Sequence, residues 1–246
     1  MKRSIVLFLF ILQFAGCSRA DNLPSAVAFG DSNTQEANWA VRKFPANEKW
    51  VNLLSVSEKG KMLIYNEGIG GQTTEHARKR FMNDVINRKP KVVFIMFGTN
   101  DALIQSNKKP WVSKERYREN LLYFIHKIRE NGGKPVLMTC LPVIEGTGAD
   151  KLYYYRTHNP ALYLPKGGAR NWHNSYNSVM KKTAKEEGVL LIDNWSKMVK
   201  KAGGATDKTL IESRMIDSSG YHMTPKGARL LYENIKSSSA FDSVQK

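Results

Sequence analysis

Hydrophobic residues gather in five short, continuously apolar runs, separated by longer stretches that are amphipathic or polar. The runs are residues 26–29, 62–65, 92–97, 135–139 and 189–192. Strands covered on both faces have this continuous character, whereas strands with one wet face alternate between apolar and polar residues. The runs therefore predict five buried strands of a mostly parallel sheet.

The stretches between these runs contain segments with helical spacing of apolar residues. Four helices are predicted, over residues 73–87, 114–131, 169–187 and 225–237. Thr224 is suited to cap the last of them, with Pro225 at its first position. Alternating strands and helices predict an α/β fold, a three-layer α/β/α sandwich around the sheet. Residues 25–246 show no internal repeat or linker, so one domain is expected there.

One connection breaks the alternation. Residues 141–168 contain three prolines, four glycines and an aromatic-basic run at 153–156. Connections of this length without periodicity are often functional loops. Because the segment follows the fourth strand, it is expected as an insertion at the carboxyl edge of the sheet, where open α/β sheets bind ligands.

The first residues have the form of a signal peptide. Lys2 and Arg3 precede a short apolar run, and residues 14–17 read Phe-Ala-Gly-Cys, which resembles a bacterial lipobox. This predicts a lipoprotein signal peptide over residues 1–16, a lipid on Cys17 and a tether over 17–24. The protein would then be exported and lipid-anchored to the cell envelope, at the outer membrane or periplasm in a Gram-negative cell. A plain signal peptide with an incidental cysteine is the alternative.

The net charge of the chain limits the classes of molecule that it is expected to bind. The 246 residues include 38 Lys plus Arg against 22 Asp plus Glu, a net charge of +16. Cleavage after residue 16 would remove Lys2 and Arg3 and leave +14. An acidic glycan or an anionic membrane would be attracted, although a solvated lysine-rich surface is the simpler interpretation. No nucleic-acid-binding motif is present, and Cys140 is expected to be a buried, inert thiol.

Polar, glycine-containing turns follow three of the predicted strands, and a fourth polar block lies near the C-terminus. They are Gly-Asp-Ser-Asn at 30–33, the turn at 66–73, Gly-Thr-Asn-Asp at 98–101, and Gly-Tyr-His-Met-Thr-Pro at 220–225. The carboxyl ends of parallel strands meet at one edge of a sheet, so these turns should converge. A serine, a histidine and amide donors in one crevice are the components of acyl transfer.

These four blocks, in this order, resemble the SGNH (GDSL-type) hydrolases over nearly the whole mature chain. The resemblance implies a flavodoxin-like fold and a serine esterase with Ser32 as nucleophile and His222 as base. It also implies an oxyanion hole formed by Ser32, Gly71 and Asn100. Neither a metal nor an organic cofactor is implied, since these groups complete acyl transfer unaided.

One position departs from the family pattern. The family places an aspartate three residues before the histidine, where this chain has Ser219, and the nearest acid is Asp217. We predict that Asp217 reaches the imidazole as the third catalytic residue. The alternatives are a Ser-His dyad oriented by Ser219 or a backbone oxygen, and Asp217 as a loop cap.

The substrate is predicted less sharply than the reaction. Tyr154, Arg156 and Trp172 are candidate substrate-binding residues, although each could instead pack the insertion onto the sheet. The expected activity is hydrolysis of O-acyl esters, above all O-acetyl, on a carbohydrate or related envelope substrate by a monomeric enzyme. Alternatives are a lysophospholipase or lipase, an acyltransferase, and a catalytically weak lipoprotein that binds a glycan or membrane.

Overall fold

The computed structural model describes residues 23–36, 45–149 and 151–242. Within them, a five-stranded sheet has the order β2-β1-β3-β4-β5, and every neighbouring pair is parallel. The strands are β1 Ser25–Gly30, β2 Leu63–Gly68, β3 Val92–Met96, β4 Lys134–Met138 and β5 Leu190–Ile192. The predicted parallel sheet is thus confirmed. The predicted signal peptide and Cys17 lie outside the described residues.

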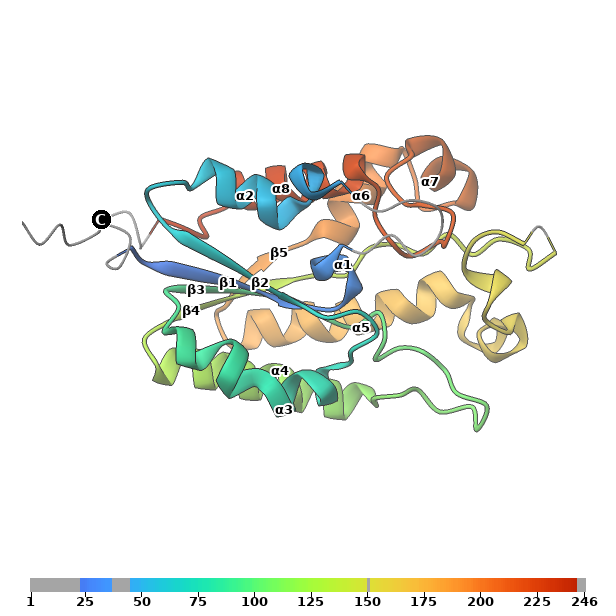
Figure 1. Cartoon of the computed structure of the whole chain (residues 1–246). Helices are drawn as coiled ribbons and strands as arrows, with labels where there is room; N and C mark the ends of the chain where they lie inside the picture. The colour runs from blue at the N-terminus through green and yellow to red at the C-terminus, as the bar shows by residue number, and fades with distance from the viewer. Residues whose placement is uncertain (1–22, 37–44, 150, 243–246) are drawn as a thin grey trace, which may run out of the picture.

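Helices cover both faces of the sheet (Figure 1). One layer comprises α2 Trp50–Ser57, α6 Asn194–Ala202, α7 Asp207–Ser213 and α8 Pro225–Lys236. The other comprises α3 Thr74–Asp84, α4 Lys114–Glu130 and α5 Ala169–Glu186. The sequence predicted α3, α4, α5 and α8 to within a few residues, and it missed α2, α6 and α7. The sandwich it predicted is correct.

Strands β1 and β3 are buried along their whole length. The edge strand β2 is only half-buried and contains Asn66 and Glu67, so the prediction of a buried strand is wrong there. Along β1, Val27 and Phe29 pack toward α3 and α4, whereas Ala26 and Ala28 pack toward α2 and α8. All four side chains are completely buried. Successive side chains of a strand point to opposite faces, so a strand between two helix layers needs an apolar residue at every position.

The strand order determines where a site can form. From β1 the chain crosses to β2 on one side, and β3 then pairs with β1 on the other side. This order is that of flavodoxin-like folds, whose ligands bind at the carboxyl ends of the strands flanking the reversal. A four-residue helix, α1 Ser32–Gln35, follows β1 at this point.

The segment 141–168 lies at the same edge (Figure 1). Its regular elements are the 3₁₀ turns η4 Tyr154–Arg156, η5 Pro160–Leu162 and η6 Leu164–Lys166. The backbone N–H of Ile144 donates to the carbonyl of Gly220 at 2.8 Å, two residues before His222. Gly220 has φ +86°, and a Cβ there would lie 2.4 Å from the Ile144 carbonyl oxygen. Only glycine permits this close approach, by which the insertion supports the histidine loop.

No helix within residues 23–36, 45–149 and 151–242 combines the length and apolarity needed to cross a bilayer.

Candidate active site

Ser32 is held at the start of α1, directly after β1. Asp31 caps this helix, with its Oδ1 accepting a hydrogen bond from the Asn33 N–H at 2.9 Å. The Ser32 side chain is nearly buried, with 4% of the residue exposed. As the first helical residue, Ser32 has a backbone N–H without an intrahelical acceptor, so that N–H is available to an anion.

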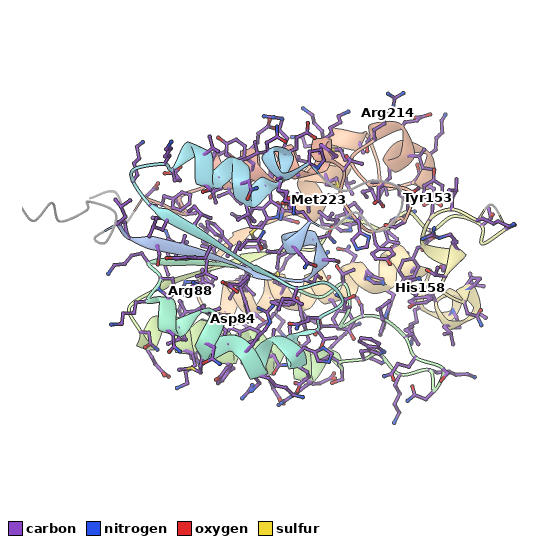
Figure 2. The ribbon with its side chains drawn as sticks, viewed as in Figure 1. Asp84, Arg88, Tyr153, His158, Arg214 and Met223 are labelled. Atoms are coloured by element: carbon purple, nitrogen blue, oxygen red, sulfur yellow. The ribbon has the colours of Figure 1, made fainter. Side chains whose placement is uncertain are left out.

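His222 reaches Ser32 from the far end of the chain. Its Nε2 lies 2.9 Å from the Ser32 Oγ. The loop around it is fixed by the side chain of Asn33, which donates to the Tyr221 carbonyl at 3.0 Å and accepts from the Met223 N–H at 3.2 Å. These two groups flank His222, so one amide aligns the base with the nucleophile beside it. Met223, labelled in Figure 2, marks this loop.

The side of the His222 imidazole that faces away from Ser32 contacts the hydroxyl of Ser219. The Ser219 Oγ lies 3.0 Å from Nδ1 of His222 and donates its own proton to Asp217 Oδ1 at 2.5 Å. A hydroxyl has one proton, so Ser219 can only accept from His222, and Nδ1 must carry the hydrogen. Nε2 is then unprotonated where it faces Ser32. This is the tautomer that a general base requires.

The structure therefore corrects the prediction that Asp217 reaches the imidazole directly. Ser219 lies between the two and occupies the position at which the family pattern has its aspartate. Asp217 Oδ1 also accepts from the Ser219 N–H at 2.8 Å, and its Oδ2 is buried without a hydrogen-bond partner among the described residues. The arrangement is a chain of four side chains, Ser32, His222, Ser219 and Asp217.

Burial changes the pKa values of the titratable groups among these four side chains. It lowers the pKa of His222 to about 4, which keeps the imidazole neutral at neutral pH. Burial also raises the pKa of Asp217, while hydrogen bonds from Ser219 and the positive charge of Arg156 act in the opposite direction. The base is thus ready to accept a proton over a wide pH range.

The predicted oxyanion residues lie on turns that are joined to each other. Asn100 Nδ2 donates to the Gln72 carbonyl at 3.0 Å, which connects the turn after β3 to the turn that contains Gly71. An amide nitrogen has two protons, so one remains for a ligand. Gly71 has φ +74°, a conformation that glycine adopts without strain. A further bond ties this turn to α1, because the Gly70 N–H donates to Gln35 Oε1 at 2.9 Å.

Residues 28–230 match the model of the GDSL-like lipase/acylhydrolase family, which is most of the chain. The chain belongs to this family. A relative from Bacillus subtilis strain 168, named the uncharacterized lipoprotein YqeF, is 54% identical over 237 residues, covering 96% of this chain and 97% of the relative.

Solved structures of GDSL-type hydrolases share the fold. A lipase/acylhydrolase from Enterococcus faecalis superposes with a TM-score of 0.63 at 23% identity, covering 87% of this chain and 93% of that one. The acetylxylan esterase Axe2 from Geobacillus stearothermophilus, as its S15A catalytic mutant, gives 0.63 at 19% identity and covers 90% and 94%. At these identities the likeness establishes the fold alone.

In this GDSL-like chain, two of the candidate substrate residues are structural. Tyr154 is completely buried and donates to the Tyr163 hydroxyl at 2.9 Å, so it is not a surface contact for substrate. Trp172 donates from Nε1 to the Ala102 carbonyl at 2.6 Å. The ammonium groups of Lys114 and Lys166 lie 4.6 and 4.5 Å from its ring centroid. Both aromatic residues pack the insertion, as the alternative interpretation held.

Arg156 differs from these two, because it is exposed and close to the catalytic chain. Its charge acts on Asp217 and on Tyr221, the residue before His222. His158, labelled in Figure 2, belongs to the same part of the insertion. Cys140 is buried as predicted, and burial raises the pKa of its thiol.

Two buried carboxyl groups flank the site without touching substrate positions. Asp31 precedes Ser32, and Asp101 follows Asn100 and accepts from the N–H and hydroxyl of Thr74. Burial raises the pKa of Asp31 to about 7, with a further contribution from the charge of Asp101. Each has an Oδ2 with no hydrogen-bond partner in the described part of the chain. Holding these charges costs stability at neutral pH.

We expect Asp31→Asn to stabilise the protein at pH 8 by on the order of 2 kcal/mol. The unfolded Asp31 loses its proton near pH 3.8 and the folded one near 7, so wild-type stability falls as pH rises between these values. Asparagine still caps α1 and has no charge to bury. The advantage should therefore vanish near pH 4, as measured by urea unfolding at both pH values.

Asp193→Asn is the matched control, since Asp193 also caps a helix, α6. Although burial raises its pKa, hydrogen bonds from Lys181 and Ser196 lower it overall. Its variant should lose stability at pH 8. Stabilisation of both variants, or of neither, would contradict the argument.

Proposed function

We propose that this protein is a serine esterase that removes O-acyl groups, above all O-acetyl, from a carbohydrate. The observation that carries the proposal is the 2.9 Å contact between the Ser32 hydroxyl and His222 Nε2, with Ser219 and Asp217 behind the imidazole. Family membership supports acyl transfer as the reaction class. Two neighbours in fold, named acetylxylan esterases, support a sugar ester as substrate.

The reaction proceeds in two halves. His222 Nε2 takes the Ser32 proton as Oγ attacks the ester carbonyl carbon, and the Ser32 and Gly71 N–H groups with the Asn100 amide stabilise the oxyanion. The imidazolium then protonates the departing sugar oxygen, which leaves an acyl group on Ser32. In the second half His222 activates water, which releases the carboxylic acid and restores the hydroxyl. Ser219 and Asp217 hold the tautomer and favour the transient imidazolium.

The position of the proposed lipid anchor favours a substrate that lies away from the membrane to which the protein is attached. Cys17 precedes Ser25 by eight residues. β1 then runs from the left-hand end of Figure 1 toward α1, so its first residue and Ser32 lie at opposite ends of a strand about 20 Å long. An anchor that enters the fold at the start of β1 would leave the catalytic edge facing away from that membrane. The relative named a lipoprotein supports such an anchor.

A lipase or lysophospholipase is the second candidate. The family description includes lipases, and the insertion exposes Leu152 and Leu164, with 42% and 67% of each residue accessible. These leucines lie on a segment built of short 3₁₀ turns rather than on a long amphipathic helix. A lid for long acyl chains needs a larger continuous apolar face. We therefore favour the short-chain ester.

The test is a series of 4-nitrophenyl esters of increasing acyl length. We expect kcat/KM to be highest for acetate and to fall by about tenfold or more by decanoate, because the described part of the insertion offers short 3₁₀ turns rather than a long apolar helix to a long acyl chain. A rate that rises with chain length would replace the proposal with the lipase. Stoichiometric labelling of the wild type by a fluorophosphonate is expected in parallel, and a protein without labelling or turnover would be a binding lipoprotein.

A further inference from the structure

A pocket of about 310 Å³ lies beside the predicted oxyanion turn. One wall is the start of α3, and the other is the loop between β3 and α4, drawn in green after β3 in Figure 1. The residues that line it are Thr73, Glu75, His76, Gln105, Trp111 and Val112. Its volume is at the lower end of the range for small-molecule sites.

The pocket begins next to the catalytic groups. Gln72, whose carbonyl accepts from the Asn100 amide, is followed directly by the lining residue Thr73. Consecutive Cα atoms are about 3.8 Å apart. An ester whose carbonyl oxygen lies between Gly71 and Asn100 would therefore be bound at a turn that continues directly into the wall of the pocket.

Both walls are fixed by one buried residue, Asp101. Its Oδ1 accepts from the Thr74 N–H at 3.0 Å and from the Thr74 hydroxyl at 2.5 Å, which holds the start of α3. Its backbone carbonyl accepts from the Val112 N–H at 3.1 Å, which holds the loop. The pocket is therefore formed before any ligand arrives, and little ordering cost falls on binding.

The lining combines an aromatic surface with hydrogen-bonding groups. Trp111 is 48% exposed, and the ring of His76 meets it edge-on with centroids 6.5 Å apart. His76 Nδ1 accepts from the Thr73 N–H at 3.3 Å, so its Nε2 carries the proton and is a donor. The hydrogen bond from Arg116 lowers the pKa of Glu75, which keeps that carboxylate ionised.

These groups match a sugar and not an acyl chain. A pyranose ring offers a face of C–H groups to an aromatic ring and hydroxyls at its edge to donors and acceptors. A hydrocarbon chain in the same place would remove water from the Glu75 carboxylate and add no bond to those that its Oε1 already accepts from Arg116 and Asn120. The indole of Trp111 supplies the large, rigid contact area typical of such recognition.

We propose that this pocket binds the sugar ring whose acyl group Ser32 removes, with Trp111 beneath the ring and Gln105, His76 and Glu75 at its hydroxyls. The inference rests on the proposed esterase function and adds a location and a set of residues for the sugar. It replaces Tyr154 and Trp172 as the aromatic contact.

The experiment compares 6-O-acetylglucose, a sugar ester whose other hydroxyls are free, with 4-nitrophenyl acetate, which has no sugar. For Trp111→Ala we expect the ratio of the two kcat/KM values to fall about tenfold, mainly through KM for the sugar ester. Gln105→Ala should lower it about threefold, since only the backbone of Gln105 bonds within its loop in the described residues. Val56→Ala, at a more exposed apolar residue on α2, should leave the ratio unchanged.

The inference is overturned if the ratio is unchanged in Trp111→Ala, whether both rates fall equally, which would indicate general damage, or neither falls, which would remove the residue from recognition. Selective loss on long-chain 4-nitrophenyl esters would assign the pocket to an acyl chain. If the wild type cleaves neither ester, the proposed function fails separately. Calorimetric binding of 6-O-acetylglucose to wild type and Trp111→Ala then tests the pocket by itself, and equal or absent binding overturns the inference.

Discussion

Replacing Ser32 by alanine is expected to lower kcat on 4-nitrophenyl acetate by about 10⁴-fold or more. No other nucleophile can take its place in the described structure. The Ser219 hydroxyl lies on the opposite side of the imidazole, bonded to Nδ1, and the Cys140 thiol is buried with a raised pKa. The oxyanion donors remain, so KM should change little.

The measurement is steady-state hydrolysis together with fluorophosphonate labelling, which should vanish in Ser32→Ala. Thermal unfolding should be nearly unchanged, because the Ser32 hydroxyl bonds only to His222 in the described residues. Ser178→Ala is the control, since Ser178 is an exposed serine on α5 whose hydroxyl bonds to its own helix. Retention of more than about a hundredth of the activity would show that Ser32 is not the nucleophile.

The parts of the fold that the sequence predicts well are those determined by local pattern. The strands are recognisable in the sequence as apolar runs. The start of α8 is recognisable from Thr224, whose hydroxyl accepts a hydrogen bond from the Gly227 N–H. The missed helix α2 has no such signal, because Lys49 caps it without a side-chain hydrogen bond. Its stability comes from burying Trp50 and Leu54 against the sheet layer, which is a tertiary effect.

In the candidate site, too, some features follow from local sequence pattern and others depend on tertiary contacts. The four motifs and their resemblance to the SGNH hydrolases were enough to predict that Ser32 and His222 meet. Ser32 follows a strand end, whereas the histidine block follows no strand and its role was implied by the resemblance. The contact of Ser219 with the imidazole depends on the turn at 217–220, where the Gly220 N–H donates to the Asp217 carbonyl at 3.0 Å. Spacing alone left three arrangements open there.

Asn33 and Trp111 were missed for a related reason. Asn33 looks like an ordinary polar residue after the nucleophile, and its two bonds to the histidine loop cross 188 and 190 residues of sequence. Trp111 faces a pocket only because the loop doubles back, with the Trp111 N–H donating to the Leu103 carbonyl at 2.9 Å. A polar residue adjoining a predicted catalytic serine was the one local signal available for Asn33.

Substitution of Ser219 is expected to cause the second large loss of activity. Ser219→Ala removes the acceptor of the His222 Nδ1 proton and leaves Asp217 without the hydroxyl it binds, so we expect kcat on 4-nitrophenyl acetate to fall about 10³-fold. The free imidazole could then adopt the other tautomer, with its proton facing Ser32. KM should be nearly constant, because Ser219 does not face the substrate.

Asp217→Asn separates charge from orientation. The amide oxygen still accepts from the Ser219 hydroxyl, so the imidazole keeps its tautomer while the negative charge is lost. We expect a loss of only about tenfold, the part of the effect that comes from stabilising the imidazolium. Equal losses for Asp217→Asn and Ser219→Ala would mean that charge alone matters, and no loss in either would mean that Ser32 and His222 act as a dyad.

The pH dependence of kcat/KM tests whether Ser219 and Asp217 act on the imidazole of His222 or only support the loop. In the wild type kcat/KM should decline only as pH falls toward 4, since burial lowers the pKa of His222 to about 4 and the base is neutral above it. In the double variant Asp217→Asn with Ser219→Asp, a carboxylate stands beside Nδ1 as in the family pattern. Direct attraction raises the pKa of the imidazole, so the decline should begin at higher pH while activity stays within about tenfold of wild type. An unchanged profile with full activity would mean that residue 219 only shapes the loop, and that the hydroxyl does not transmit the carboxylate's influence to the base.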